Sequence, residues 1–154
     1  MDESNLVKVV FRQEYEGDDE VDVECPWAEA LGGNKYRLKN FPFYTYGISF
    51  DDVFEAEPAY DDERPYLTKV IEKSGHKTLR LQLPQSIQES PECRQILDDL
   101  NAMDCGYEGN GHRFFVINVQ PHCDFDAVVG FINGCDLDWE YADPTYEQLF
   151  PNGE

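Results

Sequence analysis

Residues 78–103, TLRLQLPQSIQESPECRQILDDLNAM, mark the place where the chain changes from strands alone to strands combined with helices. TLRLQL alternates apolar and polar side chains, which is typical of a half-buried strand. Ser90 followed by Pro91 is typical of a helix start. The apolar residues after it recur at helical spacing, namely Ile96, Leu97, Leu100 and Met103. The segment therefore predicts a strand followed by a helix that ends near Gly106.

The same rhythm continues through the rest of the chain. RFFVINV, residues 113–119, is rich in β-branched and aromatic residues and predicts a strand. Asp124 then stands where a helix N-cap is expected, before an apolar stripe that ends at Asn133 and Gly134. CDLDWEYA, residues 135–142, alternates like a final strand. Residues 78–154 thus predict a β-α-β-α-β sandwich with two helices on one sheet face.

The first half contains short predicted strands separated by turns. LVKVVF, residues 6–11, and VDVEC, residues 21–25, are rich in β-branched residues, and Gly32-Gly33-Asn34 is typical of a hairpin turn. A helical period is absent from this half, so residues 1–77 predict a small curled sheet or partial barrel. We expect an α+β chain whose two halves, residues 1–77 and 78–154, form one compact folding unit.

The charge of the chain restricts its partners. The 154 residues carry a net charge of −20, with 41% hydrophobic and 14% aromatic residues to form a core. The two halves carry −9 and −11, and no Lys or Arg follows Arg113. Such a field repels phosphate backbones and anionic lipid heads but attracts basic surfaces. We therefore expect a basic protein partner, and binding to neither nucleic acid nor membranes.

Motifs for targeting, cofactors and metals are missing. The start, MDESNLVKVVF, lacks a secretory leader pattern, and no segment approaches the ~20 apolar residues of a membrane helix, so a cytoplasmic protein is expected. The five cysteines are odd in number and form no CxxC pair. Phosphate-binding, dinucleotide-binding and hydrolase motifs are absent as well. We predict no cofactor and no metal site.

Cys123 is the sharpest hint of an enzyme. It follows His122 and precedes a predicted helix N-terminus, where the helix dipole can lower the pKa of a thiol. A nucleophile also needs a general base, an oxyanion site and a pocket, none of which the sequence reveals. We therefore predict that the chain is not an enzyme. A thiol- or histidine-dependent hydrolase or transferase stays open as an alternative, as does a small-ligand sensor with its site between the two halves.

Four stretches carry a family resemblance: VKVVF at residues 7–11, VECPWAEALGGNKYRLKNFPFYTYGISFDDVFEAEP at 23–58, ERPYLTKVIEKSGHKTLRL at 63–81, and DWEYADPTYE at 138–147. With them the chain resembles a bacterial family described as domain of unknown function 4265, most specifically across residues 23–81. The resemblance implies a two-part α/β domain. It brings no catalytic residues to carry over.

The excess of acids suggests a function. Acidic side chains improve solubility, but clustering them costs stability through self-repulsion. A rigid acidic face with aromatic rings can cover a basic active-site cleft, because carboxylates occupy phosphate positions and rings fill the apolar centre. We predict an immunity or inhibitor protein that neutralises a basic bacterial toxin, such as a nuclease or another enzyme of phosphate-bearing substrates.

Two surface patches are predicted to contact this toxin. The C-terminal acidic patch consists of Asp136, Asp138, Glu140, Asp143, Tyr146 and Glu147. The N-terminal acidic patch consists of Glu14, Glu16, Asp18, Asp19 and Glu20.

Overall fold

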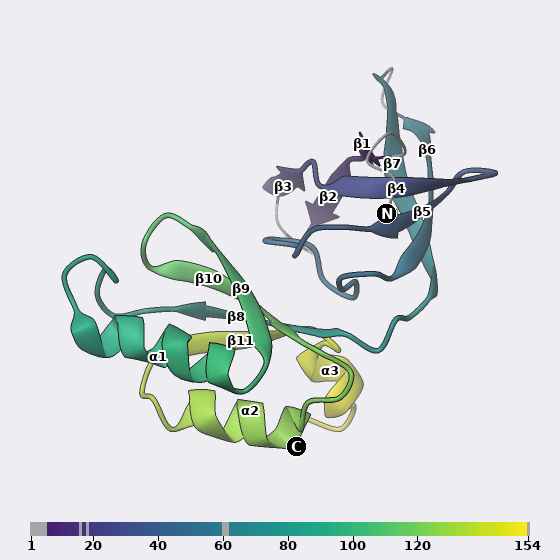
Figure 1. Cartoon of the computed structure of the whole chain (residues 1–154). Helices are drawn as coiled ribbons and strands as arrows, with labels where there is room; N and C mark the ends of the chain where they lie inside the picture. Colours follow the sequence, from purple (N-terminus) through teal and green to yellow (C-terminus); the bar gives the residue numbers. More distant parts are fainter. Residues whose placement is uncertain (1–5, 16, 18, 60–61, 154) are drawn as a thin grey trace.

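The computed structural model describes residues 6–15, 17, 19–59 and 62–153, and the chain is α+β, as predicted (Figure 1). Strands dominate the described residues, with eleven strands and three helices. The N-terminal half contains only strands: β1 (Leu6–Lys8), β2 (Phe11–Glu14), β3 (Val21–Glu24), β4 (Trp27–Gly32), β5 (Lys35–Leu38), β6 (Val53–Ala59) and β7 (Asp62–Glu72).

These strands form a curled sheet that is partly closed. Five of them pair in the antiparallel order β1-β4-β5-β6-β7, while β2 and β3 form a separate hairpin. Val10, between β1 and β2, links the first strand back to the last. Its N–H donates to the carbonyl of Pro65 at 2.8 Å, and its carbonyl accepts from the N–H of Leu67 at 2.9 Å. The closure encloses a core built around Phe11, Leu38, Ile48 and Phe54.

The turn between β4 and β5 depends on two glycines. The predicted Gly32-Gly33-Asn34 turn joins β4 to β5, and all three residues have positive φ angles of 90°, 63° and 64°. Glycine adopts such angles without steric cost, and asparagine tolerates them better than most residues. The turn prediction is confirmed.

The C-terminal half contains a second sheet covered by helices. Its elements are β8 (Lys77–Gln82), α1 (Pro91–Ala102), β9 (Cys105–Asn110), β10 (Phe114–Val119), α2 (Phe125–Asn133), β11 (Asp138–Asp143) and α3 (Tyr146–Leu149). The sheet order is β11-β8-β10-β9, with every neighbouring pair antiparallel. Figure 1 shows α1 and α2 on the same face of this sheet.

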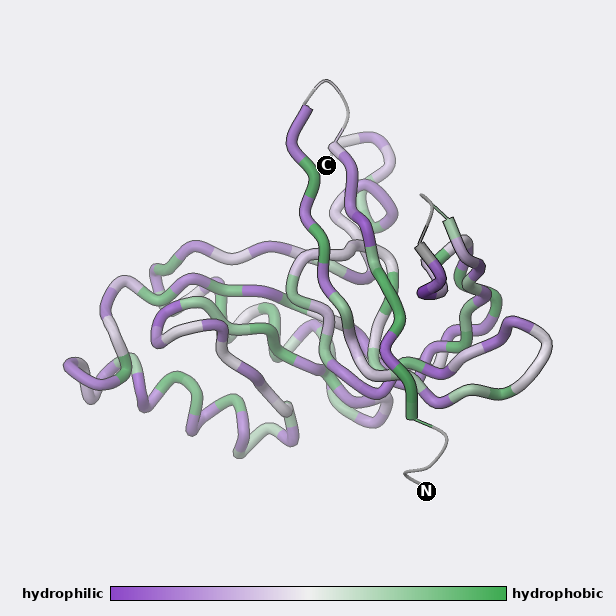
Figure 2. Tube along the Cα trace, turned by 90° about the horizontal axis from the view of Figure 1, so that it is seen from above, coloured by the Kyte–Doolittle hydropathy of each residue, from purple (hydrophilic) through white to green (hydrophobic). Residues whose placement is uncertain are grey.

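Every second residue of a strand points to the same face of the sheet, and on this sheet the apolar ones point toward the helices. Leu79 and Leu81 of β8 and Ile117 of β10 belong to one buried cluster with Leu97 of α1 and Ile132 of α2. Figure 2 shows the hydrophobic and hydrophilic residues alternating along the chain trace. The predicted helix caps are confirmed, because Ser90 accepts from the N–H of Cys93 and Asp124 from that of Ala127, both at 3.1 Å.

The β-α-β-α-β prediction for this half is wrong in one respect, because it omitted β9. CGYEGN contains two glycines and an asparagine, residues that are depleted in strands, so the segment resembled a turn. Pairing along its whole length with β10 outweighs this weak propensity and gives a β-α-β-β-α-β order. Helix α1 also ends at Ala102, earlier than the end expected near Gly106, and Asp104 after it has a positive φ of 65°. The short helix α3 was not predicted.

Residues 39–52, which we call the seam loop, join β5 to β6 and contact the sheet face opposite α1 and α2. Arg80 of β8 donates to the carbonyls of Pro42 at 3.2 Å and Thr45 at 3.3 Å. The Ser49 hydroxyl lies 2.7 Å from that of Thr78. Helices thus cover one face of the second sheet and the seam loop the other.

An ionic cluster with two buried carboxylates fastens the seam loop to both halves. The Lys73 ammonium, on the connection between the halves, donates to the carboxylates of Asp52 and Asp143. Ser49 donates its hydroxyl proton to Asp143 and its N–H to Asp52. We call these four residues, Lys73, Asp52, Asp143 and Ser49, the Lys73 cluster.

Across the described part of the chain, none of the helices combines the length and apolarity needed to cross a membrane.

Candidate functional site

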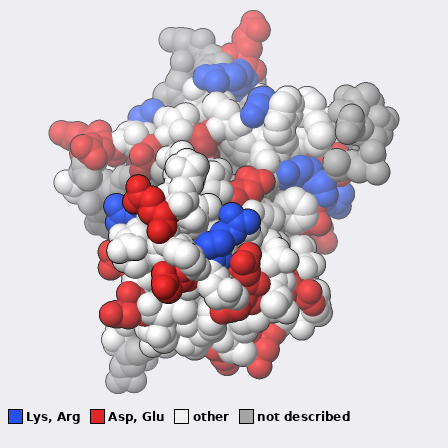
Figure 3. Space-filling view, turned by 60° about the vertical axis from the view of Figure 1, so that its left-hand side comes forward, with Lys and Arg blue, Asp and Glu red and all other residues white. Residues whose placement is uncertain are grey.

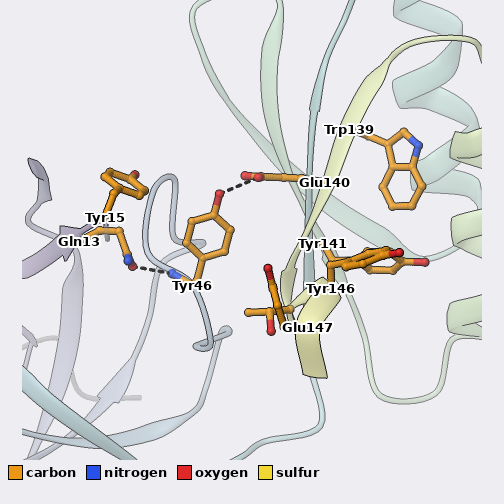
Figure 4. Close-up of a pocket in the computed structure, with 9 residues that line it drawn as sticks. Gln13, Tyr15, Tyr46, Trp139, Glu140, Tyr141, Tyr146 and Glu147 are labelled. Carbon is orange, nitrogen blue, oxygen red and sulfur yellow. Dashed lines mark hydrogen bonds between the residues drawn. The ribbon is translucent and has the colours of Figure 1, made fainter. Parts of the chain in front are cut away.

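A groove of about 700 Å³ lies where edge strand β11 faces the N-terminal half (Figure 4). Such a volume is within the usual range for ligand-binding clefts. We call it the aromatic groove, since four tyrosines and one tryptophan line it together with four polar residues. The lining consists of Gln13, Tyr15, Tyr46, Trp139, Glu140, Tyr141, Thr145, Tyr146 and Glu147.

One wall is built by β11 and α3. Trp139 and Tyr141 pack against the helix-side core, with their ring centroids 4.9 Å apart. Thr145 caps α3 by accepting from the N–H of Gln148 at 3.2 Å. Tyr146 lies in the first turn of α3, and the centroid of its ring is 6.3 Å from the centroid of the Tyr141 ring.

The opposite wall is built by β2 and the seam loop. The Gln13 side-chain oxygen accepts from the N–H of Tyr46 at 3.1 Å, and the Tyr15 hydroxyl donates to Asp22. Glu24 holds the seam loop more firmly. Its carboxylate accepts from the N–H groups of residues 43, 44 and 45, at 2.8, 2.9 and 2.9 Å, and from the Thr45 hydroxyl at 2.9 Å.

Arg80 connects the two walls from beneath. Arg80 is only 1% exposed, and its guanidinium carbon lies 4.6 Å from the centroid of the Tyr46 ring. Its Nε donates to Glu140 at 3.0 Å, and the Tyr46 hydroxyl donates to the other oxygen of Glu140 at 2.6 Å. Glu140 is therefore already balanced by an internal cation, and it positions Tyr46 in the groove.

Burial raises the pKa of three of the four tyrosines that line the groove. Burial, followed by the hydrogen bond to Glu140, raises the pKa of Tyr46 to about 12. Burial also raises the pKa of Tyr15, where the hydrogen bond to Asp22 adds to the effect, and the pKa of Tyr141. A set of neutral rings beside carboxylates is suited to a cation, because ring faces attract positive charge.

The structure divides the C-terminal acidic patch. Glu140, Tyr146 and Glu147 line the aromatic groove, while Asp136, before β11, and Asp138, its first residue, are exposed and do not line it. Asp143 must be removed from the predicted contact surface, since it is 4% exposed and its carboxylate is held in the Lys73 cluster. A register shift between Tyr141 and Asp143 places Asp143 opposite Thr78, on the face that the seam loop covers.

The described acids of the N-terminal acidic patch, Glu14, Asp19 and Glu20, do not line the groove. Glu14, Asp19 and Glu20 are exposed, and Glu14 forms an ion pair with Arg12 at 3.6 Å. Glu16 and Asp18 lie outside the described residues. The lining residues of this segment are instead Gln13 and Tyr15, which alternate with Glu14. Sequence reasoning missed them because it followed charge, although the alternation itself was visible.

The surroundings of Cys123 do not favour thiol chemistry. Its sulfur donates to the carbonyl of Met103 at 3.3 Å, while His122 lies 3.1 Å from the carboxylate of Asp104. Within the described residues, no hydrogen bond joins His122 to Cys123, so the pair lacks the contact that would activate a nucleophile. In the same part of the chain, no group of three or more His, Cys, Asp or Glu side chains is placed to hold a metal ion.

Comparisons with known proteins support the family and the fold. The family model for "Domain of unknown function (DUF4265)" matches residues 24–139, which include Tyr46 and Arg80 but neither Glu140 nor α3. The chain is also similar to a solved structure described as "Novel crystal structure of a hypothetical protein from Neisseria gonorrhoeae", with a TM-score of 0.73 and 15% identity. The match covers 88% of this chain and 94% of the other, and at this identity it concerns the fold alone. No curated protein matches the chain.

Proposed function

The chain belongs to the family described as a domain of unknown function, DUF4265, and we propose that it is an acidic immunity or inhibitor protein of a basic bacterial toxin. The aromatic groove carries this proposal, because it combines neutral rings with carboxylates on a chain of net charge −20. In the proposed complex, the groove receives Lys or Arg side chains from the rim of the toxin's active site. The toxin is a nuclease or another enzyme of phosphate-bearing substrates, and binding covers its cationic cleft.

The groove offers two kinds of attraction to such a side chain. A cation over the face of Trp or Tyr gains about 0.5–2 kcal/mol, depending on how much water is excluded. Glu147 stands at the rim on the first turn of α3, and no described residue pairs with it. Glu140 is balanced by Arg80, so Glu147 is the lining carboxylate whose charge is available to a partner.

Tyr146 is the proposed anchor of the interface. It is 46% exposed although it is a large aromatic residue, and its ring packs against Phe150 with centroids 4.8 Å apart. Tyrosines of this kind dominate binding energy in many interfaces, because they bury a large area at a low entropy cost. Tyr146 would therefore contribute more to binding than the acids around it.

The wider surface favours rapid encounter with a basic partner. Figure 3 shows acidic side chains spread over one face, with basic side chains gathered in only a few places. Charge complementarity of this kind raises association rates, and salt screens the effect. The acids Asp136 and Asp138 would act mainly in this step, since they are exposed and do not line the groove.

The groove can be tested first with a defined cationic peptide. Hexa-arginine labelled with a fluorophore should bind the unchanged chain, and Tyr146→Ala combined with Glu147→Gln should weaken binding by about tenfold or more. Glu57→Gln is the matched control, because it removes the same charge from an exposed position on β6. Equal weakening by both variants would mean that only net charge matters, and the groove proposal would fail.

Identifying the toxin requires proteins from the native host. The unchanged chain and the Tyr146→Ala, Glu147→Gln variant should be used side by side as affinity baits, and the protein lost with the variant should be identified and assayed. The proposal expects a basic enzyme whose activity is inhibited by the unchanged chain in a one-to-one titration. Recovery of a partner that is acidic, or one that stays fully active when bound, would contradict it.

A further inference from the structure

A second cavity, of about 310 Å³, lies between the seam loop and the β9–β10 hairpin. It does not share a lining residue with the aromatic groove. Phe41 and Phe50 of the seam loop contribute two rings, and His76, Asn118 and Gln120 contribute polar groups. We call it the amide cleft, after Asn118.

Asn118 is buried with an incomplete set of hydrogen bonds. The residue is 5% exposed, and its side-chain nitrogen lies 3.0 Å from Nδ1 of His76. Its side-chain oxygen has no hydrogen-bond partner among the described residues. Exchanging the amide oxygen and nitrogen does not remove the problem, because the atom turned away from His76 would then be the unpaired one. Buried polar groups are nearly always paired. The Asn118 oxygen is itself shielded from solvent, so a group bound in the cleft can meet it only if the amide turns.

The walls of the cleft are aromatic and are held in place by packing. The rings of Phe41 and Phe50 meet edge to face with centroids 5.6 Å apart, and Phe50 meets His76 in the same way at 5.3 Å. A Cβ added to Gly106 would lie 3.1 Å from the Phe41 ring. Glycine at this position of β9 therefore lets the ring lie close against the strand.

Two charged residues line the cleft, Lys39 and Glu108, and together they disfavour an anionic ligand. Lys39, which also lines it, is paired with Asp51 and lies 4.9 Å from the centroid of the Phe50 ring. Its positive charge is thus already balanced within the protein. The net charge of −20 further disfavours an anionic ligand such as a phosphate ester.

We propose that the amide cleft binds a small, neutral, planar heterocycle of the nucleobase class. The ring would lie against Phe41 and Phe50, because flat heterocycles stack on aromatic side chains. An N–H on its edge would donate to the Asn118 oxygen, and amide side chains form such pairs with base edges. The terminal torsion of asparagine is broad, so the amide can turn toward this donor. The cleft volume is at the lower end of the ligand-binding range, which fits a single base.

The test uses free bases as probes and a matched pair of variants. Adenine, cytosine and uracil should be titrated into the full chain by calorimetry, with thermal shift as a second measurement. At least one base should bind, and Phe41→Leu should weaken it by about fivefold or more through loss of ring stacking. Phe43→Leu is the control on the same loop, since Phe43 contacts Phe114 and does not line the cleft.

Two further arms separate the possible outcomes. Asn118→Ala should abolish binding of that base while hexa-arginine binding at the aromatic groove stays unchanged, which shows that the variant is folded. The nucleoside monophosphate of the same base should bind more weakly than the base. The proposal is overturned if none of the three bases binds, if Phe41→Leu and Phe43→Leu act alike, or if the monophosphate binds more tightly.

Discussion

Replacing Glu24 with alanine is expected to lower the free energy of unfolding by about 2–4 kcal/mol. This single carboxylate accepts four hydrogen bonds, from the N–H groups of residues 43, 44 and 45 and from the Thr45 hydroxyl. The loop that it holds carries Tyr46 of the aromatic groove and Phe41 of the amide cleft. Loss of the carboxylate should therefore disturb both sites together.

The magnitude follows from the donors left behind. A hydrogen bond to a charged group contributes about 1.5–3 kcal/mol, and an unsatisfied buried donor costs about 1–3 kcal/mol. The Glu24 contacts are only partly buried, so water can satisfy some of these donors and the total is smaller than the sum. Glu24→Gln keeps one acceptor oxygen but places an amide NH2 opposite a seam-loop donor. We expect it to cost about 1–2 kcal/mol on the same basis.

The assay is urea denaturation followed by the fluorescence of the two tryptophans. Glu57→Ala is the matched control, since it removes the same charge from an exposed position and should change stability by less than about 0.5 kcal/mol. The reasoning is refuted if Glu24→Ala unfolds within that margin of the unchanged chain. It is also refuted if Glu24→Ala is destabilised but binds hexa-arginine and the nucleobase as before.

Three other changes have defined outcomes. Lys73→Met leaves the two aspartates of the Lys73 cluster without their cation and should cost about 2–4 kcal/mol in urea, less than a fully buried pair because the Lys73 side chain is half exposed. The Tyr46 hydroxyl donates to Glu140 only while it is protonated, and its pKa is raised from the ordinary tyrosine value of 10.0 to about 12. This stabilisation is complete below pH 10 and is lost as the pH rises through about 12. Tyr46→Phe should therefore lose less stability across that window than the unchanged chain, as measured by urea midpoints at each pH. Burial raises the pKa of the Cys105 thiol to about 12, so iodoacetamide should label it only after unfolding, and rapid labelling of the folded chain near pH 8 would contradict its burial.

Local signals in the sequence predicted the elements that depend on neighbouring residues. Ser90 and Asp124 cap their helices as expected, because a cap needs only a side chain and an N–H three residues away. β9 was missed for the opposite reason, since its glycines weaken the local signal and pairing with β10 decides its conformation. The seam loop was equally hidden, because its place on the second sheet depends on Arg80, far along the chain.

The candidate site was predicted in part. Glu140, Tyr146 and Glu147 were identified from the run of acids and aromatics near the C-terminus, and all three line the aromatic groove. Tyr46 was missed because no spacing in the sequence brings it beside β11, and Tyr15 was missed because the prediction followed charge. The amide cleft was missed too, since the unpaired state of Asn118 becomes visible only when its neighbours are known.

The sequence by itself determined the α+β class, the helix caps and the large negative charge, because periodicity, capping and composition are local or additive properties. Only the tertiary structure decided which acids face solvent. Glu147 and Asp143 are close in sequence, yet one lies at the rim of the aromatic groove and the other is buried in the Lys73 cluster. The physical reason is that a carboxylate can be buried only where a cation and hydrogen-bond donors meet it, and those of Asp143 come from distant segments of the chain.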